Sequence, residues 1–357
     1  MAGARKIVIK VGSNILVDKG GLRKRVLIEL ARVVSELRSK GHSVAIVTSG
    51  AGAMGRVHLG LSSSPKDMIS KQALCAVGQV LLMHAYLEAF EFYGLRVAQL
   101  LLTRDDFAER SRFLNLRNTL IGLEKRGIVP VVNENDTVAV EEIRFGDNDT
   151  LSAMFAIAWD ADVLILLTSV DGVIGADGRV IEEYSEGAEL AKIEKTSFGA
   201  GGIDTKISAA LMASESGVDV YIANGNELGN VFKIVDGENP GTRFRPSGTS
   251  LTLKKSWLKY LSQPKGRIYV DAGTSSALHS RKSLLPVGIV SVEGTFERGD
   301  VVEVVHGAEL LGRGISNYSS TEVAQIKGKR SSELPEELFP YEEVVHADNF
   351  IPAKELR

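Results

Sequence analysis

The stretch Lys6-Ile-Val-Ile-Lys-Val-Gly-Ser13 decides how the first part of the chain folds. Its residues are almost continuously apolar rather than alternating, which predicts a strand buried on both faces of a sheet. Five later runs have the same character and predict further buried strands at 43–48, 96–102, 128–133, 163–168 and 218–223. Lys10 ends the first run, and Gly12 follows where the backbone can approach a ligand closely.

Amphipathic helical patterns lie between several of these strands. The clearest covers residues 25–40, with apolar residues at helical spacing and Gly41 in the position that commonly ends a helix. Similar patterns cover 69–92, 113–126 and 203–216. Strands alternating with helices up to about residue 253 predict a three-layer α/β domain with a mainly parallel sheet.

The sequence pattern changes after a lysine-rich connector at 254–267. Short strand-like runs follow at 268–270, 288–292, 301–305 and 323–326, separated by glycine turns. They predict a small β-barrel-like domain ending near residue 346. A length of 357 residues also favours two domains. We therefore expect a catalytic domain at 1–253, a linker at 254–266, the β-rich domain at 267–346 and a tail at 347–357.

Composition excludes several classes of function. A net charge of −3 gives no bulk attraction to nucleic acid or anionic membranes. Cys75 is the only cysteine, so no disulfide can form within the chain, and its helical, apolar setting predicts a buried structural thiol. No stretch reaches the roughly 18 consecutive apolar residues that a membrane span needs, so we expect no membrane span. The six histidines have no metal-ligand spacing, so we expect no zinc site.

The segment Gly199-Ala-Gly-Gly-Ile-Asp-Thr-Lys206 is a glycine-rich turn leading into a helical pattern. Backbone N–H groups at a helix start favour anions, and lysine adds a compact positive charge. It is not a Walker A loop, because Lys206 is followed by Ile207, and a plain loop with a helix cap is an alternative. Together with Lys10, the segment indicates a site for a ligand with several negative charges, such as a nucleoside triphosphate.

Gly50-Ala-Gly-Ala-Met-Gly55 matches the dinucleotide-binding pattern GxGxxG. That pattern needs a second strand carrying an acidic residue about 20 positions later. Residues 61–65 and a helical pattern stand there instead, which argues against a dinucleotide site. The preceding Thr48-Ser49 is more informative, because it follows a strand at the edge where α/β sheets bind ligands.

Two clusters of amides and carboxylates lie close together in the sequence: Asn133-Glu-Asn-Asp136 and Gly146-Asp-Asn-Asp149. Both would also serve as turns, with Asp149 as a helix N-cap. Amides together with carboxylates can recognise a small solute that carries an ammonium and a carboxylate. Thr168-Ser-Val-Asp-Gly172 follows another strand and could line a nucleotide, although a simple Asp-Gly turn fits equally well.

These motifs, in this order and spacing, resemble those of the amino acid kinase family. The tail at 267–346 resembles a PUA domain, including Gly273-Thr274 and Ser283-Leu-Leu-Pro-Val-Gly288. The two resemblances cover essentially the whole chain. Two residues depart from the family pattern: Ser169 stands where aspartate is common, and Ala200 where threonine is common.

The resemblance implies ATP-dependent phosphorylation of the side-chain carboxylate of L-glutamate, the first step of proline biosynthesis, in the cytoplasm. It implies catalytic roles for Lys10, Lys206 and Asp149, and contacts to glutamate from Ser49, Asp136 and Asn148. It implies an ATP site formed by Lys10, Gly12, Thr168, Ser169, Ala200, Gly201, Gly202, Ile203, Asp204, Thr205 and Lys206. Mg²⁺ would arrive with ATP, without a dedicated metal site.

The same resemblance implies partners. A reductase would consume the acyl phosphate product, proline would act as a feedback inhibitor, and the chain would form a homo-oligomer, either a dimer or a tetramer. Two alternatives stay open: a related kinase with another acceptor, and RNA binding through the tail. Ten Lys/Arg against fourteen Asp/Glu over 267–357 argue against RNA, because nucleic-acid backbones attract basic surfaces.

Overall fold

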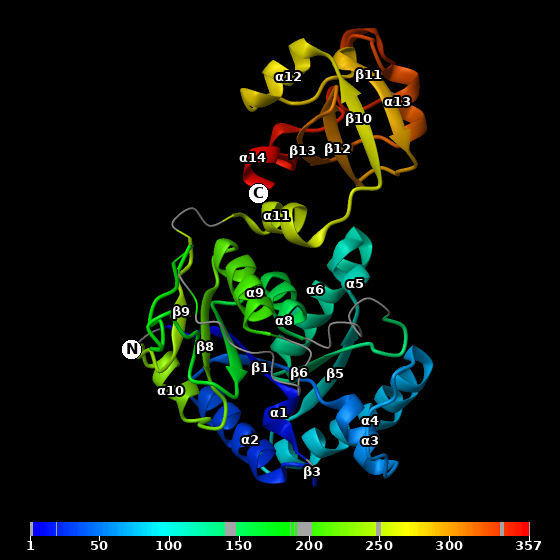
Figure 1. The fold of residues 1–357 in the computed structure, drawn as a ribbon. Helices are drawn as coiled ribbons and strands as arrows, with labels where there is room; N and C mark the ends of the chain where they lie inside the picture. The colour runs from blue at the N-terminus through cyan, green and yellow to red at the C-terminus, as the bar shows by residue number, and fades with distance from the viewer. Residues whose placement is uncertain are drawn as a thin grey trace. The chain divides into compact units, whose positions relative to one another are not determined.

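The computed structural model describes residues 3–18, 20–139, 148–185, 187–188, 190, 202–247, 251–335 and 339–356. The chain divides into two compact units. Unit 1 contains residues 1–106 and 115–250, and unit 2 contains residues 107–114 and 251–357. Each unit is built around its own sheet (Figure 1).

The sheet of unit 1 has seven strands. Their order is β5 (Val97–Leu102), β6 (Val129–Glu134), β4 (Ser43–Val47), β1 (Lys6–Val11), β7 (Val163–Thr168), β8 (Asp219–Asn224) and β9 (Thr242–Phe244). All neighbours are parallel except β8 and β9. The mainly parallel sheet expected from the sequence is confirmed. Because β1 pairs with both β4 and β7, the chain winds outward from β1 in two directions, and ligands bind at such a switch point.

Helices cover both faces of this sheet (Figure 1). One face carries α2 (Lys24–Ser39), α4 (Met68–Glu91) and α10 (Asn230–Val235), and the other α6 (Arg110–Lys125), α8 (Asp149–Trp159) and α9 (Ile203–Glu215). Ile7, Ile9 and Val11 share one hydrophobic core with α2, α4 and α10. Since side chains alternate along a strand, Lys10 lies on the opposite face, toward α8.

Short elements complete unit 1: α1 (Ser13–Leu16), β2 (Val17–Asp18), β3 (Gly21–Leu22) and α3 (Ala51–His58). Helix α5 (Arg104–Ala108) begins in unit 1 and ends in the segment 107–114 of unit 2.

Helix α4 bears on the expectation that no segment spans a membrane. Helix α4 is long and apolar enough to cross a membrane by length and composition alone, and 39% of its most apolar window is buried. A core helix of a globular protein passes the same test, and Leu82, Tyr86 and Phe90 of α4 do pack into the core.

Unit 2 contains a five-stranded sheet. Its order is β11 (Ile289–Gly294), β10 (Gly266–Val270), β12 (Val301–His306), β13 (Glu309–Ile315) and β14 (Phe350–Pro352). Its helical segments are α11 (Leu253–Ser256), the π-helix η1 (Trp257–Leu261), α12 (Ala272–His279), η2 (Pro286–Gly288), α13 (Ser320–Ile326), η3 (Ser331–Glu333), η4 (Ala347–Asn349) and α14 (Ala353–Leu356). In the lysine-rich connector, Trp257 is buried and its indole Nε1 donates to Phe107 O at 2.8 Å.

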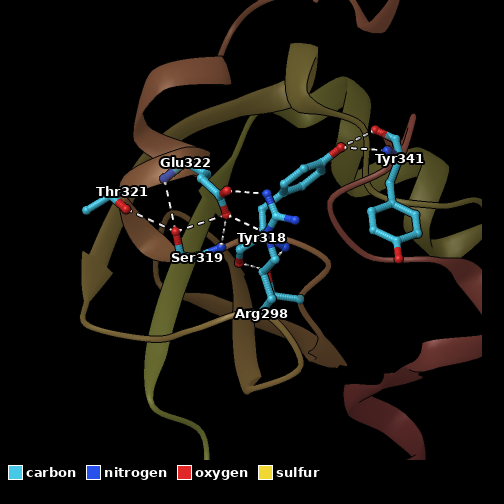
Figure 2. Close-up of polar contacts among 7 residues, drawn as sticks. Arg298, Tyr318, Ser319, Thr321, Glu322 and Tyr341 are labelled. Atoms are coloured by element: carbon cyan, nitrogen blue, oxygen red, sulfur yellow. Dashed lines mark hydrogen bonds and ion pairs between the residues drawn. The ribbon is translucent and has the colours of Figure 1, made fainter. Parts of the chain in front are cut away.

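The strand expected at 323–326 is wrong, because these residues end helix α13. Figure 2 shows the cause: a capping box joins Ser319 and Glu322 at the start of the helix. Two buried apolar residues, Val323 and Ile326, then lie on one face of the helix. Short apolar runs fit either a strand or a helix, and the cap decides between them here.

Candidate active site

The strands at the centre of unit 1 end at one edge of the sheet. β1 leads into Gly12, β4 into Thr48 and β7 into Ser169, while β6 ends at Glu134. Because these strands are parallel, the residues that follow them gather at one edge. Nearly every site residue expected from the sequence and described by the structure comes from this edge or from the first turns of α8 and α9.

Asp149 lies at the centre of the site. It is the first residue of α8, and its side chain is fully buried. Lys10 Nζ donates to its Oδ1, and Lys206 Nζ donates to its Oδ2 at 2.8 Å. Two ammonium groups on one carboxylate leave an excess positive charge, and burial strengthens its attraction for an incoming anion.

Local structure explains why these three side chains meet. Strand alternation turns Lys10 toward α8. A carboxylate in the first turn is favoured at Asp149, because helix N-termini carry partial positive charge. Helix α9 begins after Gly202, and Lys206 is in its first turn, in a helix that packs against α8. Thr205 Oγ1 donates to Gly202 O at 2.8 Å, which fixes the start of α9.

Glycine is required at one turn beside the site. Gly50 has φ = 107°, in the left-handed region that favours glycine, and it links β4 to α3. The preceding Ser49 donates from Oγ to Val11 O at 3.1 Å, so the ends of β4 and β1 are held together. At Gly12, an added Cβ would lie 4.0 Å from Lys10 Nζ, so the absence of a side chain keeps the backbone beside this lysine open.

A cavity of about 530 Å³ opens beside the buried carboxylate. Ser49, Asp136 and Asn148 all line it, so the structure brings the three expected glutamate contacts to one cavity. Asn148 is the residue before Asp149, which places this part of the wall next to the lysine pair. The other lining residues are Ser13, Asn14, Gly50, Ala51, Gly52, Ala53, Arg56, Ser62, Ser63, Ser64, Lys71, Leu74, Cys75, Asn133 and Glu134.

Buried amides support this wall. Asn148 Nδ2 donates to Thr48 O and, at 2.7 Å, to Asn133 Oδ1. Asn133 Nδ2 donates to Gln79 Oε1 at 2.7 Å, and Tyr86 OH donates to Thr48 Oγ1 at 2.9 Å. Sequence reasoning missed Gln79 and Tyr86, because nothing near them in the sequence indicates a site. Their only local signal is a polar residue on the otherwise apolar buried face of α4.

Two cations also line the cavity, Arg56 on α3 and Lys71 on α4, and the sequence did not single out either of them. The backbones of the two helices touch where they cross. A Cβ added at Gly55 would lie 2.0 Å from Leu74 O, and one added at Gly78 would lie 1.7 Å from Ala51 O. Glycine at both positions therefore permits the α3–α4 contact that forms this wall.

Cys75 was expected to be a buried structural thiol, but it is only half-buried and lines the cavity. Burial, together with the neighbouring Asp136 carboxylate, raises the pKa of Cys75 to about 12. The thiol is therefore protonated at neutral pH, and its nucleophilicity is correspondingly low.

The nucleotide side of the site is described in part. Thr168 ends β7 and is half-buried, while Ser169 is exposed just beyond it. Ile203, Asp204 and Thr205 form the first turn of α9. Ala200 and Gly201 lie outside the described residues, as do the first two residues of the motif at 146–149.

In this α/β unit, a buried carboxylate lies between two lysines at the switch point of the sheet. This arrangement suits the binding of an anion such as phosphate. The chain belongs to the amino acid kinase family, whose model matches residues 5–224. The PUA domain model matches residues 266–338.

The chain is similar to a Thermotoga maritima protein named glutamate 5-kinase, with 56% identity over 324 residues, covering 90% of this chain and 92% of that protein. A Kosmotoga olearia protein with the same name is 50% identical over 353 residues, covering 96% and 98%. Among solved structures, isopentenyl phosphate kinase has 19% identity and a TM-score of 0.46, covering 67% of this chain and 99% of that one.

Proposed function

We propose that this protein transfers the γ-phosphoryl group of ATP to the side-chain carboxylate of L-glutamate, giving ADP and L-glutamyl 5-phosphate, the first step of proline biosynthesis. Relatives named glutamate 5-kinase match almost the full length of the chain. The observation that carries the proposal is the Lys10–Asp149–Lys206 cluster beside a cavity lined by Ser49, Asp136 and Asn148.

The chemistry needs no general base. The attacking group is a carboxylate, which is already ionised at neutral pH because its reference pKa is about 4.3. The obstacle is the approach of one anion to another. Lys10 and Lys206 neutralise the transferring phosphoryl group and the bridging oxygen of ATP, and Asp149 holds the two ammonium groups at a fixed spacing. Catalysis then comes from positioning and charge stabilisation.

ATP lies at the carboxyl ends of β1 and β7 in this proposal. Backbone N–H groups at Gly12, Gly201 and Gly202 bind phosphate oxygens, and Thr168 with Ser169 borders the nucleoside. Mg²⁺ would reach the site bound to ATP and would neutralise charge on the phosphates, since it retains waters and prefers phosphate with few protein carboxylates. Asp149 accepts from two lysines, so we assign it to holding these ammonium groups rather than to a metal.

Glutamate occupies the cavity with its side-chain carboxylate toward the lysine pair. Ser49 borders the reacting end, and Asp136 pairs with the α-ammonium, with Asn148 beside it in the same cavity. The two lining cations, Arg56 and Lys71, add positive charge to a cavity that must accept a dicarboxylate.

One assay tests the reaction and its alternatives. Acyl phosphates react with hydroxylamine, so purified protein with ATP and Mg²⁺ is assayed for hydroxamate with glutamate, aspartate or N-acetylglutamate as acceptor. We expect product with glutamate. Product with another acceptor and none with glutamate would identify a related kinase, and no product with any acceptor would overturn the proposal.

Further parts of the proposal concern the surroundings of the enzyme. An acyl phosphate hydrolyses readily, so we propose a reductase that consumes it as a transient partner. We propose proline as a feedback inhibitor, a cytoplasmic location and a homo-oligomeric state, dimer or tetramer. The oligomer is supported by large exposed apolar residues on α4, among them Ile69, Val80 and Leu87.

A further inference from the structure

A chain of three amides connects helix α4 to the acceptor cavity. Gln79 Oε1 accepts from Asn133 Nδ2 at 2.7 Å, and Asn133 Oδ1 accepts from Asn148 Nδ2 at 2.7 Å. The three residues come from α4, β6 and the residue before α8. All are buried: Gln79 is 9% exposed, Asn133 2% and Asn148 6%.

The order of donors and acceptors in this chain is set at its two ends, by the Gln79 oxygen and by the Thr48 carbonyl, which accepts from Asn148. An amide offers oxygen on one side and nitrogen on the other, so its orientation follows from its neighbours. With Gln79 oxygen facing Asn133 nitrogen, Asn133 must turn its oxygen to Asn148. If the Gln79 oxygen were removed, Asn133 could flip, and two NH₂ groups would then face each other between Asn133 and Asn148.

The far end of the chain reaches the cavity. Asn148 uses Nδ2 for both Asn133 Oδ1 and Thr48 O, so its two N–H bonds are committed to the protein. Its remaining polar atom, Oδ1, accepts from no donor among the described residues, and Asn148 lines the cavity. A carbonyl oxygen in the same cavity as the Asp136 carboxylate suits a ligand group that donates hydrogen bonds, such as the ammonium of an amino acid.

Gln79 itself carries an unfavourable feature. Its Nε2 is buried without a hydrogen-bond partner among the described residues. A buried donor without a partner destabilises the folded state, and an apolar side chain of similar size would avoid that cost. The Gln79 oxygen, rather than its nitrogen, is therefore the reason for an amide at this position.

We propose that Gln79 is a positioning residue for the acceptor. It fixes the orientation of Asn133, whose Oδ1 then holds Asn148 Nδ2 together with Thr48 O, so that Asn148 Oδ1 faces the α-ammonium of the substrate together with Asp136. The same helix also holds the neighbouring loop two turns later, where Tyr86 OH donates to Thr48 Oγ1. This proposal rests on the proposed function in naming glutamate as the ligand.

The test replaces Gln79 with methionine, which keeps the length of the side chain and removes the acceptor oxygen. We expect the KM for glutamate to rise about tenfold, the value of one hydrogen bond lost from binding, with the KM for ATP unchanged. Gln79→Glu keeps an acceptor oxygen and, if buried as the neutral acid, should recover most of the affinity. Gln72→Met, on the same helix outside the cavity, is the matched control and should resemble the parent protein.

A second measurement does not depend on the substrate. Exchange of the Asn148 side-chain amide protons, followed by NMR with labelled asparagine, should accelerate in Gln79→Met and not in Gln72→Met. Unchanged exchange, or equal rises in both KM values, would overturn the positioning role. Failure of the parent protein to phosphorylate glutamate would overturn the proposed function alone, since accelerated exchange would still support the role of Gln79.

Discussion

At the scale of single residues, Lys206 provides the sharpest test of the site. Lys206→Ala removes one of two ammonium groups held on Asp149, and with it the charge that meets the transferring phosphoryl group. Loss of one such contact lowers kcat by about 10²–10³. Steady-state kinetics should show this loss, whereas Lys125→Ala, at an exposed position in the last turn of α6, should not. Near-normal turnover in Lys206→Ala would remove this residue from the mechanism.

Asp136 tests the division of the site into an ATP side and an acceptor side. Asp136→Asn keeps the shape of the side chain and removes the charge that pairs with the α-ammonium. Hydrogen bonds to charged groups contribute about 1.5–3 kcal/mol, so the KM for glutamate should rise about tenfold to a hundredfold. Kinetics with each substrate varied in turn would show the effect. A rise in the KM for ATP instead would mean that the two halves are assigned the wrong way round.

The residues of the site differ in how far the sequence could predict them. Lys10, Asp149 and Lys206 follow strand ends or begin helices, so their local patterns already indicate ligand binding. Gln79 lies in the middle of α4, and its partner Asn133 is 54 positions away. Only tertiary packing brings the two together, so no local pattern could reveal the amide chain.

At the scale of elements, the close crossing of α3 and α4 predicts a large effect from a small substitution. Gly78→Ala would place a Cβ 1.7 Å from Ala51 O, so the helices must separate and the cavity wall must move. We expect a clearly lowered melting temperature and a raised KM for glutamate.

Gly122→Ala is the control for this prediction. It lies inside α6, where the nearest atom to an added Cβ is a flexible arginine end 3.7 Å away. Alanine is favoured over glycine in helices by up to about 1 kcal/mol, so this variant should be as stable as the parent or more so. Equal stability of the two glycine variants would contradict the role of the helix crossing.

The start of α13 predicts an acid-sensitive contact in unit 2 (Figure 2). Hydrogen bonds from Arg298 lower the pKa of Glu322 from 4.5 to about 2. A carboxyl group with a lowered pKa stabilises the folded state above its unfolded pKa, and that stability is lost as pH falls through the folded pKa. Glu322→Gln should therefore unfold more easily than the parent near pH 6, and the difference should shrink toward zero between about pH 4.5 and 2.

Tryptophan fluorescence can follow this transition in unit 2. Trp257 belongs to unit 2 and Trp159 to unit 1, so a Trp159→Phe background leaves one reporter in the unit of interest. A difference between Glu322→Gln and its parent that stays constant from pH 6 to pH 2 would show that the ionised carboxylate contributes nothing.

The elements of the fold were predictable to different degrees. The six strands predicted for unit 1 were located within a residue or two, because continuous apolar runs mark strands. The expectation that all six are buried on both faces is wrong for β5, which lies at the edge of the sheet and is mostly half-buried or exposed. The end of helix α13 was predicted as a strand, because a short apolar run containing Val323 and Ile326 is compatible with the spacing of a strand or of a helix. Strand β14, with three residues, is too short to give a pattern, and its place comes from pairing with β13.

At the scale of the whole molecule, the exposed side of α4 is the feature that a single chain does not explain. Apolar residues recur along α4 at alternating spacings of four and three: Ile69, Ala73, Ala76, Val80, Met83 and Leu87. All are exposed except Met83, which is half-buried and packs against the core. Ile69 is 80% exposed and Val80 71%. This spacing is the one by which two helices pack along a shared seam, and a two-fold dimer would pair α4 with its own copy.

Substitution along this seam tests whether a second copy covers it. Val80→Glu with Leu87→Glu places two charges where apolar side chains would meet, so the oligomer should dissociate while the monomer remains folded. Sedimentation or light scattering would give the mass, and circular dichroism would confirm the helix content. Ile121→Glu, at a similarly exposed apolar position on α6 across the sheet, should leave the mass unchanged. The seam would not be the interface if the parent sediments as a monomer, or if the double variant keeps the parent's mass. Every proposed catalytic residue lies in unit 1 of one chain, so each copy should hold a complete site. Dissociation of the oligomer with an unchanged kcat would confirm this.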